Sequence, residues 1–565
     1  MASTTELELT AIDRRPSASS NKTSESIRPI SANRSDQRPQ DGSPVNDITD
    51  TVVADASAQP EYPTGAKLYV IMLVLSAILV VASLDINIVA TAVPAITDHF
   101  HTVADVGWYQ SAYRLSWCSF QFMFGTSYKL FSVKRVFLLA NVISIIGSLL
   151  CAAATSSAML IVGRAVGGVA SAGIFSGYFA ILIQFLPLHR RPMALGLMSG
   201  LEGTAILAAP LVGGALTQSL GWRWCFWINL PIGVVTLLLT MWCLYDIPKP
   251  AAIAEMTLKQ KLSQLDLVSN LLFLPSLTSL FLALSWAGTK YSWSDVRVIG
   301  CFVVFAVLLG VFLYNQYRRG DAAALPFRVM KNRTVVAGLI FVMCSASAGN
   351  VFEYYMPTYF QVVRGYSPAK SGYMMVPKII GGTVGAIVLG VGTSTFGYYG
   401  PFMLFSSVVM PIAAGLITTF KIDTSVAQLI TYLALSGFAY GVGFSGPQSA
   451  VQTVLPTDDV HLGSSIMLFS QCFGPAVAVA VAQVLFTNQL STNLGHLKLG
   501  LNGTDIYDTG LTELVMNVPP ERVKDVLGQV DNSLVHTWYL VVSLACMTII
   551  GSITIEWRTV KAKKD

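Results

Sequence analysis

From Lys67 onward the chain alternates between apolar runs of about 18–25 residues and short polar breaks. An α-helix rises 1.5 Å per residue, so runs of this length match a hydrocarbon core of about 30 Å. The pattern predicts an all-α membrane protein with about 14 transmembrane helices. We expect these near 68–92, 107–128, 136–154, 159–186, 193–217, 225–245, 267–287, 296–316, 334–359, 371–391, 400–420, 426–451, 463–487 and 534–556.

The composition supports a protein whose surface faces lipid. Hydrophobic residues make up 53% of the chain and charged residues only 12%, whereas soluble domains usually carry about 25% charged residues. So few charges could not cover a soluble surface of this size. The formal net charge of +5 is small and dispersed, so no nucleic-acid partner is expected.

Three spaced matches indicate an internal repeat. Gly125-Thr126-Ser127 and Gly392-Thr393-Ser394 close the second and tenth spans, Pro187 and Pro456 end the fourth and twelfth, and Ala209-Pro210 and Gly474-Pro475 lie inside the fifth and thirteenth. The members of each pair stand 265 to 269 positions apart. This predicts two six-helix halves with a two-helix insertion between them, since paired halves are typical of one large transporter class.

These boundaries divide the chain into segments. Residues 1–64 are rich in Ser, Thr, Pro and charged residues, and such a composition predicts a disordered cytoplasmic tail. The remaining segments are an N-terminal six-helix half at 65–246, a linker plus two inserted helices at 247–320, a C-terminal six-helix half at 321–557 and a cytoplasmic tail at 558–565.

Lys and Arg placement predicts the orientation. The loops on the same side of the membrane as the two termini hold Lys134, Arg190, Arg191 and Arg319, whereas the loops on the opposite side carry fewer Lys and Arg residues. The excess of positive charge marks the cytoplasmic side, so both termini are expected inside. The long loop near 488–533 would then lie outside, and Asn502-Gly503-Thr504 in it is a candidate glycosylation site.

Ionisable residues inside membrane spans are costly, so they are functional candidates. Asp85, Arg114 and Arg164 lie at similar predicted depths in spans one, two and four. We expect these three residues to form a buried charge cluster, with a static ion pair that fixes the helix register as the alternative. Glu353 and Lys378 also match in depth, and there a static pair is the expectation.

The sequence of the fifth span predicts a helix that bends and gates a pathway. Glu202 lies near its middle among Gly200, Gly203 and several alanines, and small residues let helices approach closely. Proline removes a backbone donor and bends a helix. The gating residues are predicted to be Glu202, Gly203, Pro210, Gly213 and Gly214, with plain tight packing as the alternative.

Aromatic residues could supply the walls of a pocket for an apolar substrate. Candidates occur in spans two, nine and twelve, although aromatic stripes in membrane helices more often meet lipid or a neighbouring helix. The candidate pocket residues are Tyr109, Tyr113, Phe352, Tyr355, Tyr359 and Phe438.

Several motifs resemble the major facilitator superfamily, in its fourteen-spanner drug:proton antiporter branch and especially the fungal toxin and multidrug efflux pumps. The resemblance covers roughly residues 65–560, and its most specific part is Gly221–Gly233, GWRWCFWINLPIG. Similar stretches are Leu84–Ile96, Arg164–Gly168, Gly203–Gly214, which matches the antiporter signature, and Tyr354–Gln361. The resemblance implies that Asp85 and Arg164 couple transport to protons, and Arg114 is a third candidate for proton coupling.

Two positions depart from the family pattern. Ala209 precedes Pro210 where the antiporter signature usually has Gly, and Lys129 stands four places after Gly125 where an acidic residue is usual. The charge relay known on the cytoplasmic side of the wider superfamily is therefore not expected in its usual form.

The leading hypothesis is a secondary antiporter that exports hydrophobic or amphiphilic molecules such as drugs, toxins and secondary metabolites, with protons and a small-molecule substrate as its partners in the bilayer. The alternative is a carrier of basic amino acids or iron-chelates, and a membrane receptor or enzyme is more remote. No intramembrane His–carboxylate pair and no phosphate-binding loop occurs in the sequence. We therefore expect no enzyme, cofactor or metal site, and a monomer in the plasma membrane, with the vacuolar membrane as the alternative.

Overall fold

The computed structural model describes residues 66–101, 105–246, 249, 251–287, 291–495 and 522–561. The predicted disordered tail, Asn502 and the last residues of the chain lie outside these ranges. The described part is helical, and it contains α2 (Ala66–Phe100), α3 (Val106–Leu130), α4 (Val133–Ala152), α5 (Ser157–Phe185), α6 (Arg191–Ser219), α7 (Trp224–Trp227), α8 (Asn229–Cys243), α11 (Leu267–Trp286), α12 (Val296–Arg319), α14 (Arg333–Thr358), α15 (Pro368–Phe396), α16 (Gly400–Ile417), α17 (Val426–Phe444), α18 (Gly446–Val454), α19 (Thr457–Gly495) and α22 (Val523–Thr554).

These helices confirm the predicted membrane architecture. In the described residues, thirteen segments are long and apolar enough to cross a bilayer. Helix α3 is a fourteenth element of 25 residues, which at 1.5 Å per residue gives about 37 Å. It is less apolar because it carries Arg114, Gln121 and several serines, and it packs between α5 and α19 rather than against lipid.

Two of the predicted spans are interrupted. The sixth is divided at Ile228 into α7 and α8, and the twelfth is divided at Ser445 into α17 and α18. Lipid offers no hydrogen bonds to free backbone groups, so interruptions occur where protein surrounds the chain. Cys225, Phe226 and Asn229 at the first break and Ser445 and Gly446 at the second are buried.

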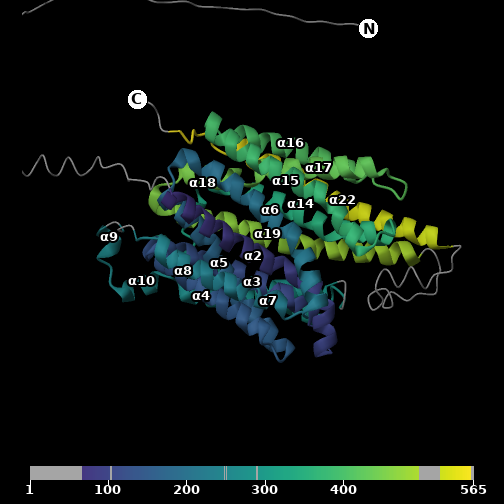
Figure 1. Ribbon diagram of the computed structural model, residues 1–565, viewed down its shortest axis with the longest axis horizontal. Helices are drawn as coiled ribbons and strands as arrows, with labels where there is room; N and C mark the ends of the chain where they lie inside the picture. Colours follow the sequence, from purple (N-terminus) through teal and green to yellow (C-terminus); the bar gives the residue numbers. More distant parts are fainter. Residues whose placement is uncertain are drawn as a thin grey trace, which may run out of the picture. The chain divides into compact units, whose positions relative to one another are not determined.

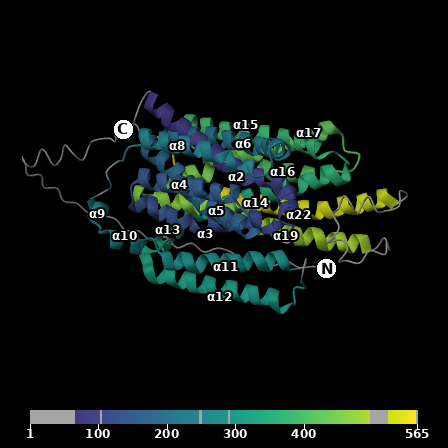
Figure 2. The same cartoon turned by 60° about the horizontal axis from the view of Figure 1, so that its bottom comes forward.

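The two halves pack against each other through corresponding pairs of helices, as expected for an internal repeat. Within the N-terminal half α3 packs on α5, and within the C-terminal half the corresponding helices α15 and α17 pack together. Between the halves α3 packs on α19 and α15 packs on α6, which are again corresponding pairs. Both views show α6 alongside α15 (Figures 1 and 2).

The inserted helices lie beside one of these seams. Helix α11 contacts α3 and α19, while α12 packs on α11 (Figure 2). Their shared anchor is Asp266, a fully buried residue with φ 51° that caps α11 through the Ser269 amide. Its carboxylate also accepts hydrogen bonds from Gln316 Nε2 at 2.7 Å and Arg319 at 2.9 Å, both on α12.

The two helices that flank the predicted outside loop extend further than the sequence predicted. Helix α19 continues to Gly495 and α22 begins at Val523, whereas the sequence placed a loop over 488–533. The polar residues in these extensions bind one another, since Asn493 Nδ2 donates to Ser533 Oγ at 3.0 Å. The buried contacts of Leu490, Leu494 and Val526 supply the apolar side of the pair.

Lys129, Arg191, Arg328 and Lys561 mark one end of the helices, which we call the basic end. Helix α3 reaches this end at its C-terminus, and Lys561 Nζ binds the Thr395 carbonyl oxygen at the C-terminus of α15.

Candidate substrate cavity and charge pairs

Asp85 and Arg164 form an ion pair inside the N-terminal half. Arg164 on α5 donates to Asp85 Oδ2 on α2 at 3.0 Å, and its side chain is only 1% exposed against 13% for Asp85. Arg164 Nε also binds the Tyr109 carbonyl oxygen at 3.0 Å, and its guanidinium carbon lies 4.2 Å from the centre of the Tyr113 ring. The pair therefore joins α2, α3 and α5.

A third residue, Asn229, also binds the Asp85 carboxylate. Asn229 Nδ2, at the start of α8, donates to Asp85 Oδ1 at 2.9 Å. The motif that precedes it is fixed to neighbouring helices, because Arg223 binds the Ala154 carbonyl oxygen at 2.8 Å and the Trp222 ring packs on Phe100. Sequence reasoning missed Asn229 as a site residue, although it lies in the most specific motif.

Two glycines after Arg164 allow the close approach of α5 to α3. A side chain at Gly168 would collide with the Tyr113 backbone carbonyl, and one at Gly167 would press on the Tyr113 ring beside Asp85. These contacts explain why the two positions of α5 that face α3 shortly after Arg164 are glycines.

A cavity of about 200 Å³, the outer cavity, lies between the two halves. Helices α2, α3 and α6 line it from one half, and α14, α15, α17 and α19 from the other. Its ionisable residues are Arg114, Glu202, Glu353 and Lys378, and its aromatic residues are Trp117, Tyr440 and Phe444.

The predicted charge cluster is therefore two separate groups. Arg114 lines the outer cavity, while the hydrogen bonds of the Asp85 carboxylate within the described residues go to Arg164 and Asn229.

Glu353 and Lys378 pair in the wall of the outer cavity as the sequence predicted. Lys378 Nζ lies 2.8 Å from Glu353 Oε1 and also binds the Gly349 carbonyl oxygen at 3.3 Å. The Lys378 side chain is 5% exposed and that of Glu353 is 47% exposed. The ammonium is thus held by the protein, whereas the carboxylate borders the cavity.

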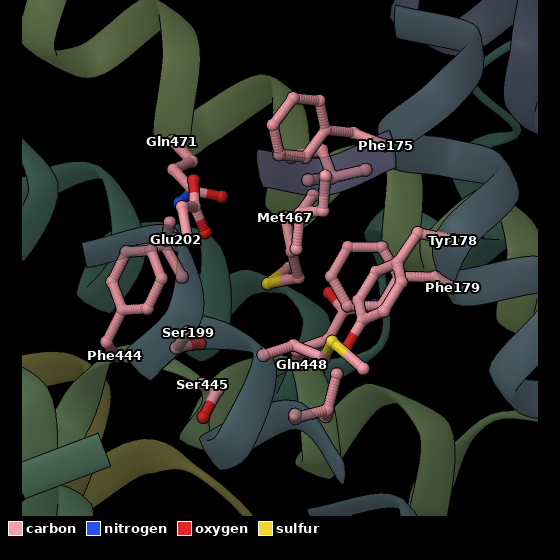
Figure 3. Close-up of a pocket in the computed structure, with 15 residues that line it drawn as sticks. Phe175, Tyr178, Phe179, Ser199, Glu202, Phe444, Ser445, Gln448, Met467 and Gln471 are labelled. Atoms are coloured by element: carbon pink, nitrogen blue, oxygen red, sulfur yellow. The ribbon is translucent and has the colours of Figure 1, made fainter. Parts of the chain in front are cut away.

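A second hollow, the inner chamber, adjoins the outer cavity. The two share Ser199, Glu202, Phe444 and Gln471. The inner chamber is lined further by Phe175, Tyr178, Phe179, Met467 and Gln448 together with several aliphatic residues. Figure 3 shows the Glu202 and Gln471 side chains pointing toward each other from α6 and α19.

The aromatic residues predicted for the pocket lie elsewhere. They pack in the cores of the two halves or, for Phe438, against Phe405, and they do not border either hollow. Tyr355, for example, binds Gln483 Oε1 at 2.8 Å inside the C-terminal half. The residues so placed are Tyr109, Tyr113, Phe352, Tyr355, Tyr359 and Phe438. Periodicity cannot distinguish a helix face that meets a cavity from one that meets another helix.

The glycines of α6 serve two different contacts. Side chains at Gly196 or Gly200 would meet α15 of the other half, at Ala386 and Thr383, and Gly203 also faces Thr383. Gly213 instead contacts Ile88 and Thr91 on α2 of its own half, and Gly214 faces open space. The part of α6 that touches the other half is thus nearer the basic end than predicted, and Pro210 is exposed.

Contacts between the halves gather at the basic end. A side chain at Gly125 would collide with Ser465 on α19, Gly196 approaches Gly390, and the Met193 amide donates to Ser394 Oγ at 3.1 Å. A charged hollow between two repeated helical halves is typical of membrane transporters.

Comparison with known proteins gives the family. The family model described as Major Facilitator Superfamily matches residues 75–479. The chain belongs to this superfamily, and it is a multi-pass integral membrane protein.

The chain resembles several fungal proteins over most of its length. It is 43% identical to the MFS-type efflux pump MFS1 of Arthroderma benhamiae over 89% of this chain and 93% of that protein. It is 40% identical to the efflux pump aflT of Aspergillus parasiticus over 91% and 100%, and 39% identical to the efflux pump roqT of Penicillium rubens over 86% and 89%.

Solved structures share the fold at low identity. The proton:xylose symporter XylE aligns with a TM-score of 0.54 at 14% identity, covering 88% of this chain and 97% of that one. FucP in its outward conformation aligns with a TM-score of 0.52 at 12% identity, covering 84% and 98%.

Proposed function

We propose that this protein is a proton-coupled antiporter that exports hydrophobic or amphiphilic small molecules. The observation that carries the proposal is a hollow between the two halves that combines aromatic walls with four ionisable residues. Apolar walls with few polar groups suit an apolar or amphiphilic ligand. The relatives named as efflux pumps, at about 40% identity over most of their length, support export rather than uptake.

The Asp85–Arg164 pair supports a role in proton coupling. Asp85 on α2 is paired in charge with Arg164 on α5, and the neutral Asn229 amide donates a hydrogen bond to the same carboxylate. Burial favours the neutral acid and a neighbouring Arg favours the carboxylate. A small movement of α2 relative to α5 would change this balance, so proton binding and helix movement would be linked.

The arrangement of contacts supports an outward-facing state. The halves meet at the basic end, which the Lys and Arg bias assigns to the cytoplasm. We further propose a plasma-membrane monomer in which 65–246 and 321–557 are the halves that move and 247–320 is the linker with its inserted pair.

The proposal is tested in sealed vesicles that contain the purified full-length protein. With the basic end on the outer face of the vesicles, an imposed pH gradient, acidic inside, should drive uptake of fluorescent toxins or dyes. A protonophore should abolish the uptake. Uptake that continues unchanged when the gradient is collapsed would contradict proton coupling, and absence of uptake across a broad panel would contradict export.

A further inference from the structure

Of the two carboxylates that line the outer cavity and the inner chamber, Glu202 has neither an ion-pair nor a hydrogen-bond partner among the described residues. Glu353, the other carboxylate at the hollow, is paired with Lys378 at 2.8 Å. Glu202 is half-buried, and a carboxylate that loses part of its hydration without a compensating partner is destabilised. A bound ligand at the junction of the outer cavity and the inner chamber could therefore supply the partner that Glu202 lacks.

The surroundings of Glu202 suit a positive charge on an apolar body. The inner chamber presents the rings of Phe175, Tyr178, Phe179 and Phe444 (Figure 3). Aromatic faces attract cations, and the attraction grows when the site is desolvated. The positive groups at the hollow do not occupy this place, because Lys378 is held by Glu353 and Arg114 lines only the outer cavity.

Polar atoms in the chamber wall also lack partners. The Tyr178 hydroxyl and Gln448 Nε2 are buried without a hydrogen bond, although buried polar groups in proteins nearly always have one. Gln471 points toward Glu202 from α19, so the carboxylate and the amide belong to different halves (Figure 3). A ligand held between them would contact both halves at once.

We propose that Glu202 is the counter-charge for a lipophilic organic cation, with Gln471 beside it and the aromatic rings of the inner chamber around the apolar part of the ligand. The inference names a substrate class for the proposed exporter and rests on that function. The groups that face Glu202 are Tyr178 from α5, Tyr440 from α17 and Gln471 from α19, and none of them carries a charge that could replace the cation.

The test measures binding without any gradient, so its result is independent of whether transport is proton-driven. The purified full-length protein is titrated with tetraphenylphosphonium and with tetraphenylborate, which have nearly the same shape and opposite charge. We expect the cation to bind at least tenfold more tightly than the anion, and Glu202→Gln to weaken cation binding at least tenfold. The matched control is Glu255→Gln, an exposed carboxylate outside both hollows, which should stay within twofold of the wild type.

A second measurement uses the wild-type protein and so avoids any folding defect of the variant. Dicyclohexylcarbodiimide modifies carboxyl groups in apolar surroundings, and peptide mass spectrometry locates the product. Tetraphenylphosphonium should slow modification of Glu202 at least fivefold, whereas tetraphenylborate should not. Unchanged cation binding by Glu202→Gln, or modification of Glu202 that the cation does not slow, would overturn the assignment and leave Glu202 as a site for protons or water.

Discussion

Arg328 and Asp459 form a bidentate ion pair, with guanidinium nitrogens 2.5 and 3.1 Å from the two carboxylate oxygens. Lys129 at the end of α3 lies 3.7 Å from the same carboxylate, which is only 3% exposed. One acidic group of the C-terminal half thus binds a cation from each half. At this contact the N-terminal half supplies a base, Lys129, and the C-terminal half supplies the acid.

This contact should not act as a proton switch through its arginine. Hydrogen bonds from Arg328 to Asp459 and to Asp321 raise the pKa of the Arg328 guanidinium above its already high value. The arginine therefore keeps its charge at every physiological pH. The part of the contact that breaks when the halves separate at the basic end is the bond to Lys129.

Lys129→Ala should loosen the closed basic end. The Lys129 side chain is 23% exposed, so the lost ion pair contributes about 0.5–1 kcal/mol. That corresponds to a shift of about two- to fivefold toward the state open at the basic end. The check is the rate at which a maleimide modifies Ser465→Cys, which Gly125 covers in the closed state. The control is Lys331→Ala, which removes an exposed lysine that forms none of the ion pairs described. Equal maleimide modification rates in the Lys129→Ala and Lys331→Ala backgrounds would contradict the proposal that the Lys129–Asp459 contact stabilises the closed basic end.

Asp85→Asn should abolish proton-driven accumulation and also lower stability. The amide cannot titrate, and it leaves the buried Arg164 without its counter-charge, a change that typically costs about 3–5 kcal/mol. Asn229→Ala removes a hydrogen bond to the same carboxylate and leaves an acid at position 85. It should cost about 1–2 kcal/mol yet keep the pH gradient coupled to transport. Thermal unfolding and vesicle uptake check both effects, and coupled transport by Asp85→Asn would show that this carboxylate is purely structural.

Gly196→Ala should slow turnover while Gly214→Ala should not. A methyl group at Gly196 collides with the Ala386 backbone across the two halves, whereas Gly214 faces open space. Overpacking costs about 1–3 kcal/mol, and here the cost falls on the state in which α6 and α15 touch. Transport at saturating substrate, normalised to membrane abundance, gives the comparison. The same change at Gly213 should reduce the amount of folded protein instead, because its contact with α2 lies within one half.

Asp266→Ala should separate the inserted helices from each other. The change removes the carboxylate that accepts hydrogen bonds from Gln316 and Arg319, and it places alanine at φ 51°, a backbone angle that aspartate tolerates better than alanine does. We expect a loss of about 2–4 kcal/mol and a lower midpoint of thermal unfolding. Asp266→Asn tolerates the same backbone angle and retains an acceptor, so it should lose about half as much. Equal losses in the two variants would contradict the role of the carboxylate as the shared anchor.

Both termini should be protected from protease in sealed right-side-out vesicles. The reason is the excess of Lys and Arg at the basic end, where the C-terminal segment binds α15 through Lys561. A tag inserted near Asn502 should be digested under the same conditions. Cleavage of either terminal tag would reverse the orientation and with it the direction of the proposed transport.

Sequence reasoning found the spans because the length of an apolar run reports directly on bilayer thickness, and even the polar α3 was placed within two residues of its ends. The pairs Asp85–Arg164 and Glu353–Lys378 could also be predicted, since opposite charges at the same depth in a membrane stabilise each other. The residues that line the cavity walls could not be predicted in this way. Tyr178 and Tyr113 look alike in the sequence, and only the packing of α5 and α3 decides that the first borders a hollow and the second binds Arg164.

Helix α11 lies against α3 and α19, one helix from each half. Of the two seams along which the halves meet, the inserted pair screens one, and within the described residues its contacts are with α3 and α19 rather than with α6 and α15. The transporter has two unequal flanks although its halves are repeats. Molecules dissolved in the bilayer meet a covered flank on one side and an uncovered one on the other, so any lateral route to the hollow is directed to the side of α6 and α15.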